Sequence, residues 1–148
     1  MNDFLNEFVQ NRIFLAAAVA WLLAQTIKVL LTLMVERELR LERFHGSGGM
    51  PSAHTATIVA ASTAIGIVEG WGSSVYALSL IMAFIVMYDA SGVRRSVGKQ
   101  AKLLNSILLD IYKHKHFEEE KLKELIGHKP TEVVVGAVLG IIIANLIV

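Results

Sequence analysis

Four apolar stretches, separated by polar segments, dominate the chain and predict helices over residues 13–35, 53–69, 73–89 and 130–148. A helix needs roughly 20 apolar residues to cross a bilayer, and the first and last stretches fit this length well. The middle two are shorter and rich in small residues, which favour close helix packing in lipid. The alternative is a soluble protein with buried helices, but the first, third and fourth stretches have almost no polar face. The pattern therefore predicts an all-α integral membrane bundle of about four transmembrane helices, forming one domain over residues 1–148.

The segment before the last stretch has a different pattern. Residues 96–127 are charged, and their apolar residues recur at helical spacing: Leu103, Leu104, Ile107, Leu108 and Ile111. This pattern predicts an amphipathic cytoplasmic helix that lies on the membrane surface. A second, solvated helical piece is expected around residues 118–123, with Gly127 at its end.

Composition narrows the class further. Hydrophobic residues make up 54% of the chain and charged residues 18%, which is more apolar than a typical soluble domain. The sequence has no cysteine, which excludes disulfides and thiolate metal sites. A net charge of +1 gives no reason to expect a nucleic-acid partner. The acidic start of the chain, with Asp3 and Glu7, is unlike a signal peptide, so no cleaved targeting segment is expected.

The positions of the basic residues predict the orientation in the membrane. With four spans, the loops 36–50 and 91–129 lie on the same side. Together they carry twelve of the fourteen Lys and Arg residues. The positive-inside rule places both loops in the cytoplasm and both termini outside. We therefore expect a multi-pass protein of the inner (plasma) membrane.

This topology gathers polar residues at the cytoplasmic ends of the spans. Gly48 and Gly49 precede Pro51 and Ser52 at the start of the second span. Proline suits the first helical position, because its missing N–H needs no partner there. The free N–H groups of the helix then face the glycine turn, where the backbone can approach an anion closely. Taken alone, however, this run also fits a plain tight turn.

The histidines favour a functional interpretation. Among the five in the sequence, His114 and His116 lie in a lysine-rich stretch and are expected to be solvated, and His45 is ambiguous. His54 lies one turn into the second span, and His128 directly precedes the fourth. Glu132 follows His128 by four residues, a spacing that brings side chains together on a helix. A carboxylate there can hold Nδ1–H and leave Nε2 available as a nucleophile.

Basic side chains near these histidines are candidates for binding phosphate. Lys28 lies about 10 Å inside the first span, where a charge is costly and is a functional candidate by default. The alternative is a lysine that snorkels to the interface. Arg94 and Arg95 follow the third span, where guanidinium groups match phosphate oxygens or simply anchor the helix. Asp89 is placed to fix one of these arginines.

These motifs resemble a known superfamily. Pro51-Ser52-Ala53-His54 resembles the Pro-Ser-Gly-His motif of type 2 phosphatidic acid phosphatases (PAP2) and vanadium haloperoxidases. His128-Lys129-Pro130-Thr131-Glu132 is similar to the His-x-x-x-Asp helix of that superfamily. Nearly the whole chain resembles its small divergent branch of membrane proteins, and further matching segments are Ala24 to Lys28 and Asp89 to Arg95.

The resemblance implies a PAP2-like, metal-independent phosphatase that needs no cofactor. His128 would attack phosphorus to form a phosphohistidine, His54 would protonate the leaving alkoxide and Glu132 would orient His128. A site on the cytoplasmic face favours a lipid phosphate of that leaflet as substrate, of the phosphatidylglycerophosphate or phosphatidic acid type, with isoprenoid diphosphates as an alternative. The groups expected to hold the phosphate oxygens are Lys28, Arg94, Arg95, Ser52 and the Gly49 N–H.

The chain also departs from the superfamily pattern. Lys28 is followed seven residues later by Val35 rather than Arg-Pro, and Arg95 is far from His128. The usual Asp is Glu132, and four spans replace six. A catalytically silent protein that binds anionic lipid or phosphate is therefore an alternative. A small transporter or structural subunit is another, in which Gly136 and Gly140 serve helix pairing. The same glycine stripe led us to expect a homodimer.

Overall fold

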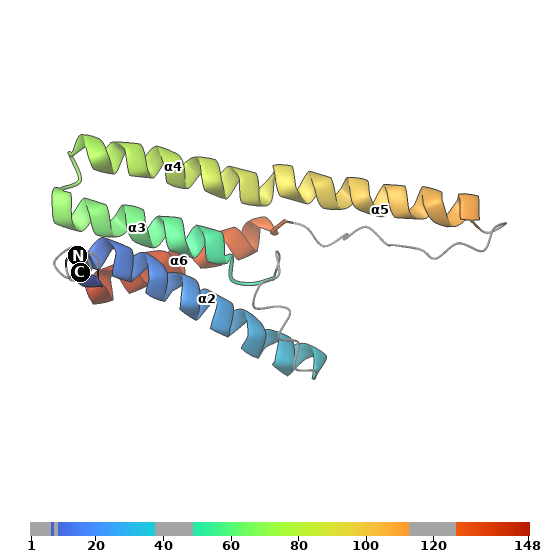
Figure 1. Ribbon diagram of the computed structural model, residues 1–148, viewed down its shortest axis with the longest axis horizontal. Helices are drawn as coiled ribbons and strands as arrows, with labels where there is room; N and C mark the ends of the chain where they lie inside the picture. The colour runs from blue at the N-terminus through green and yellow to red at the C-terminus, as the bar shows by residue number, and fades with distance from the viewer. Residues whose placement is uncertain (1–6, 8, 38–48, 113–126) are drawn as a thin grey trace.

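The computed structural model describes residues 7, 9–37, 49–112 and 127–148, and the elements in these ranges are helices (Figure 1). They are α2 (Arg12–Glu36), α3 (Ala53–Glu69), α4 (Ser74–Ser91), α5 (Val93–Tyr112) and α6 (Pro130–Ile147). The all-α prediction is confirmed, and the four predicted apolar helices match α2, α3, α4 and α6 to within two residues at each end. His45, His114, His116 and the expected helical piece around 118–123 lie outside the described residues.

The four apolar helices run up and down through one bundle. The bundle has two ends, which are named here by what they carry. At the terminal end, Arg12 at the start of α2 donates a hydrogen bond to the carbonyl of Val148, with an Nη1–O distance of 3.2 Å. At the opposite end, the site end, α3 and α6 begin and α2 and α4 finish (Figure 1). The sequence motifs with candidate chemistry therefore meet at the site end.

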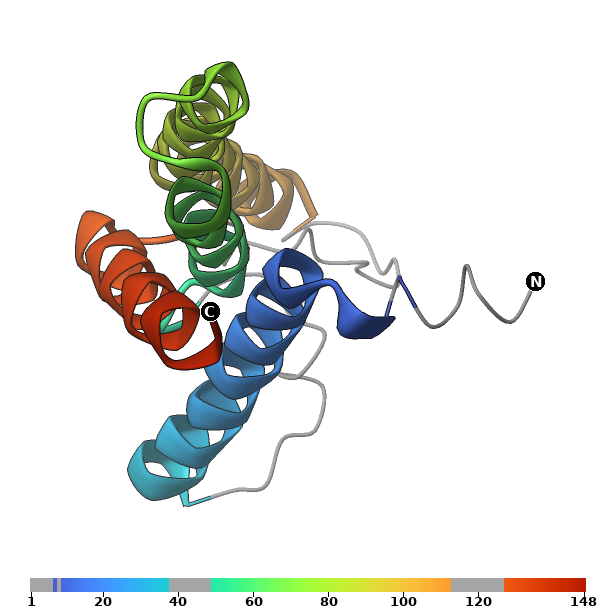
Figure 2. The same cartoon turned by 90° about the vertical axis from the view of Figure 1, so that its left-hand side faces the viewer.

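Helix α3 lies at the centre of the bundle, with α2, α4 and α6 around it (Figure 2). Its buried residues are small, which lets three neighbours approach its backbone. Small residues also recur every fourth position on the facing sides of α2 and α6. The three stripes that form this core are Ala16, Ala20 and Ala24 in α2, Ala56, Ala60 and Ala64 in α3, and Gly136, Gly140 and Ala144 in α6.

The two glycines of α6 pack directly against the backbone of α3. A Cβ on Gly136 would lie 2.6 Å from the carbonyl oxygen of Ser52, and one on Gly140 would lie 2.6 Å from that of Ala56. The stripe therefore pairs two helices of the same chain. The homodimer stays a prediction.

Large apolar side chains cover the outside of the bundle, as a lipid solvent requires. Within the described residues, three helical segments are long and apolar enough to cross a membrane: Arg12–Met34, Ser74–Leu108 and Pro130–Ile147. Helix α3 has 17 residues, or about 26 Å, slightly less than a ~30 Å hydrocarbon core. Because α3 is surrounded by other helices, it has less contact with lipid than they have.

Helix α5 differs from its prediction in both position and direction. It begins at Val93 rather than near residue 96 and continues α4 in almost the same direction (Figure 1). The helical hydrogen bonds continue through Gly92, whose N–H bonds to Tyr88 O at 2.8 Å and whose carbonyl accepts from Ser96 N at 3.0 Å. Because these hydrogen bonds carry the helical path past Gly92, α5 extends beyond the bundle instead of folding across its end (Figure 1).

Candidate functional site

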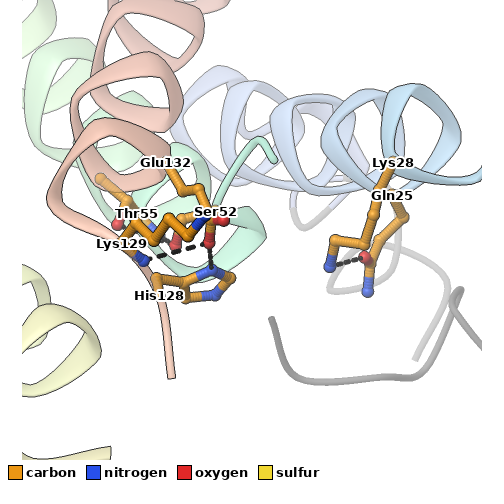
Figure 3. Close-up of polar contacts among 7 residues, drawn as sticks. All are labelled: Gln25, Lys28, Ser52, Thr55, His128, Lys129 and Glu132. Atoms are coloured by element: carbon orange, nitrogen blue, oxygen red, sulfur yellow. Dashed lines mark hydrogen bonds and ion pairs between the residues drawn. The ribbon is translucent and has the colours of Figure 1, made fainter. Parts of the chain in front are cut away.

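The centre of the site is a histidine–carboxylate pair at the start of α6. His128 Nδ1 lies 3.0 Å from Glu132 Oε2, as the i+4 spacing predicts. An ionised carboxylate only accepts hydrogen bonds, so Nδ1 is the donor in this contact, and a neutral imidazole then has its lone pair on Nε2. The same Glu132 oxygen accepts the Lys129 N–H at 3.2 Å, which caps the helix (Figure 3). The same carboxylate therefore both holds the imidazole ring and stabilises the first turn of α6.

Local sequence explains why α6 begins beside this histidine. Pro130 takes the first helical position, as predicted, and Lys129 is the N-cap. Gly127 has φ +98°, a conformation that favours glycine, and it turns the chain into His128. His128 thus lies just outside the helix and Glu132 in its first turn.

Two backbone hydrogen bonds connect this pair to the neighbouring helices. Ser52 N–H donates to the Glu132 carbonyl at 3.0 Å, and His128 N–H donates to the Ala90 carbonyl at 2.9 Å. The first bond joins the start of α3 to the start of α6, and the second joins the end of α4 to His128. The imidazole, with an exposed fraction of 3%, is therefore positioned by three helices.

The turn before α3 corrects one prediction. Pro51 is not the first helical residue, because α3 begins at Ala53 with Ser52 as its N-cap. The Ser52 oxygen accepts from Thr55 N at 3.4 Å and from Thr55 Oγ1 at 3.0 Å. Serine is a strong N-cap residue because its oxygen satisfies an orphan N–H, and here this preference places the helix start. Ser52 is fully buried, so its hydroxyl serves the cap in this structure.

Lys28 forms a second polar group, on α2. Its ammonium donates to Gln25 Oε1 at 2.7 Å, and the two side chains are 3% and 6% exposed. The stem of Lys28 packs on the turn before α3, where a Cβ on Gly49 would lie 3.3 Å from Lys28 Cγ. Gly49 also has φ +86°, so both the close approach of Lys28 and the backbone conformation favour glycine at this position. Figure 3 shows this group apart from the His128–Glu132 pair.

The remaining predicted site residues occupy the same end of the bundle. His54 lies in the first turn of α3, two residues after Ser52, and its side chain is exposed. Asp89 is half-buried in the last turn of α4, next to the Ala90 carbonyl that binds His128. Arg94 and Arg95 lie in the first turn of α5. Their side chains are outside the described part of the structure.

The structure adds residues that the sequence analysis left without a role. Gln25 binds Lys28, and Thr55 binds Ser52. Both pairs have the i, i+3 spacing at which helical side chains meet. Two polar residues three positions apart in an apolar stretch could therefore have predicted each contact. The role of the Ala90 carbonyl had no such signal, since its partner lies 38 positions away.

The electrostatics of this end suit an anion. The N-termini of α3 and α6 carry the positive ends of their dipoles, and Lys28 of α2 packs on the turn before α3. Among the described residues, no three His, Asp or Glu side chains gather into a metal site. The arrangement therefore combines an oriented imidazole with positive potential.

A helical membrane bundle with an oriented histidine at one end is the class that this fold and geometry define. The sequence pattern of the Divergent PAP2 family matches residues 9–143, and the chain belongs to this family. It is also similar to a Bacillus subtilis (strain 168) protein named "Uncharacterized membrane protein YuiD". The two are 38% identical over 148 residues, covering 93% of this chain and 94% of that protein. No solved structure matches the chain.

Proposed function

We propose that the protein hydrolyses a lipid phosphomonoester through a phosphohistidine on His128. The observation that carries this proposal is the 3.0 Å contact between His128 Nδ1 and Glu132, which directs the Nε2 lone pair away from the carboxylate. A nucleophile oriented by a hydrogen-bonded partner is the usual arrangement in covalent catalysis. Membership of the Divergent PAP2 family supports the same reaction class.

The reaction proceeds in two displacements. The Nε2 lone pair of His128 attacks phosphorus, and the bond from phosphorus to the lipid oxygen breaks. His54 gives its proton to the departing alkoxide and then takes one from water, which attacks the phosphohistidine and releases inorganic phosphate. Glu132 is a positioning residue that keeps Nδ1 protonated throughout.

Positive groups at the site end hold the phosphate oxygens in this proposal. They are the Lys28 ammonium, the Gly49 N–H, and Arg94 and Arg95 on α5, with Ser52 as a further donor. Most of the catalysis then comes from positioning and electrostatic stabilisation, as in other phosphoryl transfers. We place this end on the cytoplasmic face of the inner membrane, because the loops there carry most of the Lys and Arg residues. Phosphatidylglycerophosphate and phosphatidic acid are the substrates that suit this face.

The proposal is tested by phosphate release from phosphatidylglycerophosphate and phosphatidic acid in detergent. We expect His128→Ala to lower the rate by on the order of 10³-fold or more, since it removes the nucleophile. His116→Ala is the matched control, because that histidine belongs to a lysine-rich stretch of the sequence and is not one of the predicted site residues, and its rate should equal the parent's. Acid-labile phosphate trapped on the parent and absent from His128→Ala would identify the phosphohistidine.

The same variants separate catalysis from simple binding. A folded parent that releases no phosphate from either lipid would overturn the enzyme proposal. In that case, binding to phosphatidic acid vesicles that survives His128→Ala and weakens in Lys28→Ala would indicate a lipid-binding protein.

A further inference from the structure

A groove of about 370 Å³ runs along the bundle between α3, α4 and α6. Its walls are mostly apolar, from Val59, Leu80, Ala83, Met87, Ala137 and Ile141. Figure 2 shows α4 and α6 against different sides of α3, so the groove has α3 as its floor and opens between the other two helices. No role in the proposed reaction uses it.

One end of the groove lies toward the site end of the bundle, where Met87 of α4 lines it. Met87 is three residues before Ala90, whose carbonyl accepts the His128 N–H. Three residues of helix are about 4.5 Å. The hydrogen bond between His128 and Ala90 thus lies about one helical turn beyond the end of the groove on α4.

The groove runs along most of the bundle. Along α4 it extends from Met87 to Tyr76, which is about 16 Å at 1.5 Å per residue. Tyr76 lies in the first turn of α4, so the far end of the groove is at the terminal end of the bundle. At the far end, Trp71 and Tyr76 pack edge to face with 5.0 Å between their ring centroids.

We propose that this groove binds one acyl chain of the lipid phosphate whose headgroup meets His128. The inference deepens the proposed function, on which it rests. An apolar wall and an end about one helical turn from Ala90, whose carbonyl accepts the His128 N–H, together fit an acyl chain that runs from the site end along the bundle. A helix from a second copy does not fit, because a helix is 10–12 Å across and a cavity of about 370 Å³ is too small to hold one of this length.

Binding the chain would fix the distance between the phosphate and Nε2. Part of the binding energy of the substrate then comes from a region remote from the reacting atoms, and it holds the phosphate in position. We therefore expect phosphatidic acid with long chains to be hydrolysed with a lower KM than dibutyryl phosphatidic acid, whose chains reach only the mouth of the groove.

Two neighbouring residues of α6 provide a matched test. Ala137 lines the groove, whereas Val138 is exposed on the surface of the helix, 51% accessible and outside the groove. Ala137→Phe should raise KM for dioleoyl phosphatidic acid at least tenfold and leave dibutyryl phosphatidic acid unchanged. Val138→Phe should change neither. If Ala137→Phe changed KM equally for both lipids, or if Ala137→Phe and Val138→Phe had equal effects on KM, the proposal would be overturned.

A second pair on α4 covers the case in which Ala137→Phe fails to fold. Leu80 lines the groove, and Leu78 is 62% exposed outside it. Leu80→Trp is expected to reproduce the selective loss on the long-chain lipid, and Leu78→Trp to behave as the parent. The opposite order would contradict the proposal.

Photo-crosslinking tests the groove without turnover. The probe is phosphatidic acid with a diazirine on one acyl chain, in phosphatidylcholine vesicles that contain the full-length protein. We expect label on Met87 and Leu80 in excess of Leu78 and Ile81, which are exposed outside the groove. Equal labelling of all four residues would contradict the proposal. If the parent crosslinks selectively but releases no phosphate, the proposed reaction fails and the chain-binding groove stands.

Discussion

The two sides of α3 are packed in opposite ways. Toward α6, Gly136 and Gly140 bring the two backbones together with no space for a methyl group. Toward α4, the helices meet through side chains: Ser62 and Ser79 share a hydrogen bond of 3.0 Å, and Leu80 and Met87 of α4 line the groove. The same helix therefore packs backbone to backbone on one side and through side chains on the other, and the size of the facing side chains decides which.

The largest expected effect comes from closing the space at the α3–α6 contact. In Gly140→Ala the new Cβ would lie 2.6 Å from Ala56 O and 2.9 Å from Ala60 N, both backbone atoms that cannot move independently. We expect a loss of about 1–3 kcal/mol in the free energy of unfolding. Unfolding by SDS in mixed micelles measures it. Gly72→Ala is the control, because nothing lies within 4 Å of its Cβ position.

A smaller effect is expected on the α4 side. A Cβ on Gly66 would lie 2.4 Å from the ring of Trp71. That ring is 58% exposed and can rotate away, so Gly66→Ala should lose only the Trp71–Tyr76 packing, about 0.5–1.5 kcal/mol. Emission from Trp71 should shift as the ring moves, measured in a Trp21→Phe background that leaves one tryptophan. If Gly66→Ala lowered the free energy of unfolding as much as Gly140→Ala does, a side-chain neighbour would be as costly to a new methyl group as a backbone neighbour, and the comparison would fail.

The smallest effect is expected at the hydrogen bond between α3 and α4. Ser79 donates to Tyr76 O at 2.8 Å, which leaves its oxygen to accept from Ser62. A double-mutant cycle with Ser62→Ala and Ser79→Ala should give a coupling of about 0.6 kcal/mol, typical of such bonds between membrane helices. A coupling near zero would show that side-chain size alone holds α4 in place.

Some features of the site were predictable because they depend on residues close together in the chain. The contact between His128 and Glu132 follows from their four-residue spacing. It forms although Pro130 lies between the two residues and His128 lies outside α6. The start of α3 at residue 53 was predicted from the apolar pattern, but the role of Pro51 as its first helical residue was not confirmed, because Ser52 takes the N-cap position. The roles of Arg94 and Arg95 stay predictions.

Features that depend on distant residues were not predictable. The connection of His128 to Ala90, the packing of Gly136 on Ser52 and the groove each join helices that are far apart in the sequence. The direction of α5 also differed from its prediction, since an amphipathic pattern identifies a helix face without saying which way the helix leaves Gly92.

The sequence by itself determined the class of this protein, its apolar helices and the spacing of its histidine–carboxylate pair. Hydropathy and helical periodicity are local properties, and lipid requires every spanning segment to satisfy its own backbone. Only the tertiary structure decided which small residues form the core, which helices position His128 and where a groove remains. Those outcomes depend on how side chains from separate helices fill the space between them, which no single segment of the sequence contains.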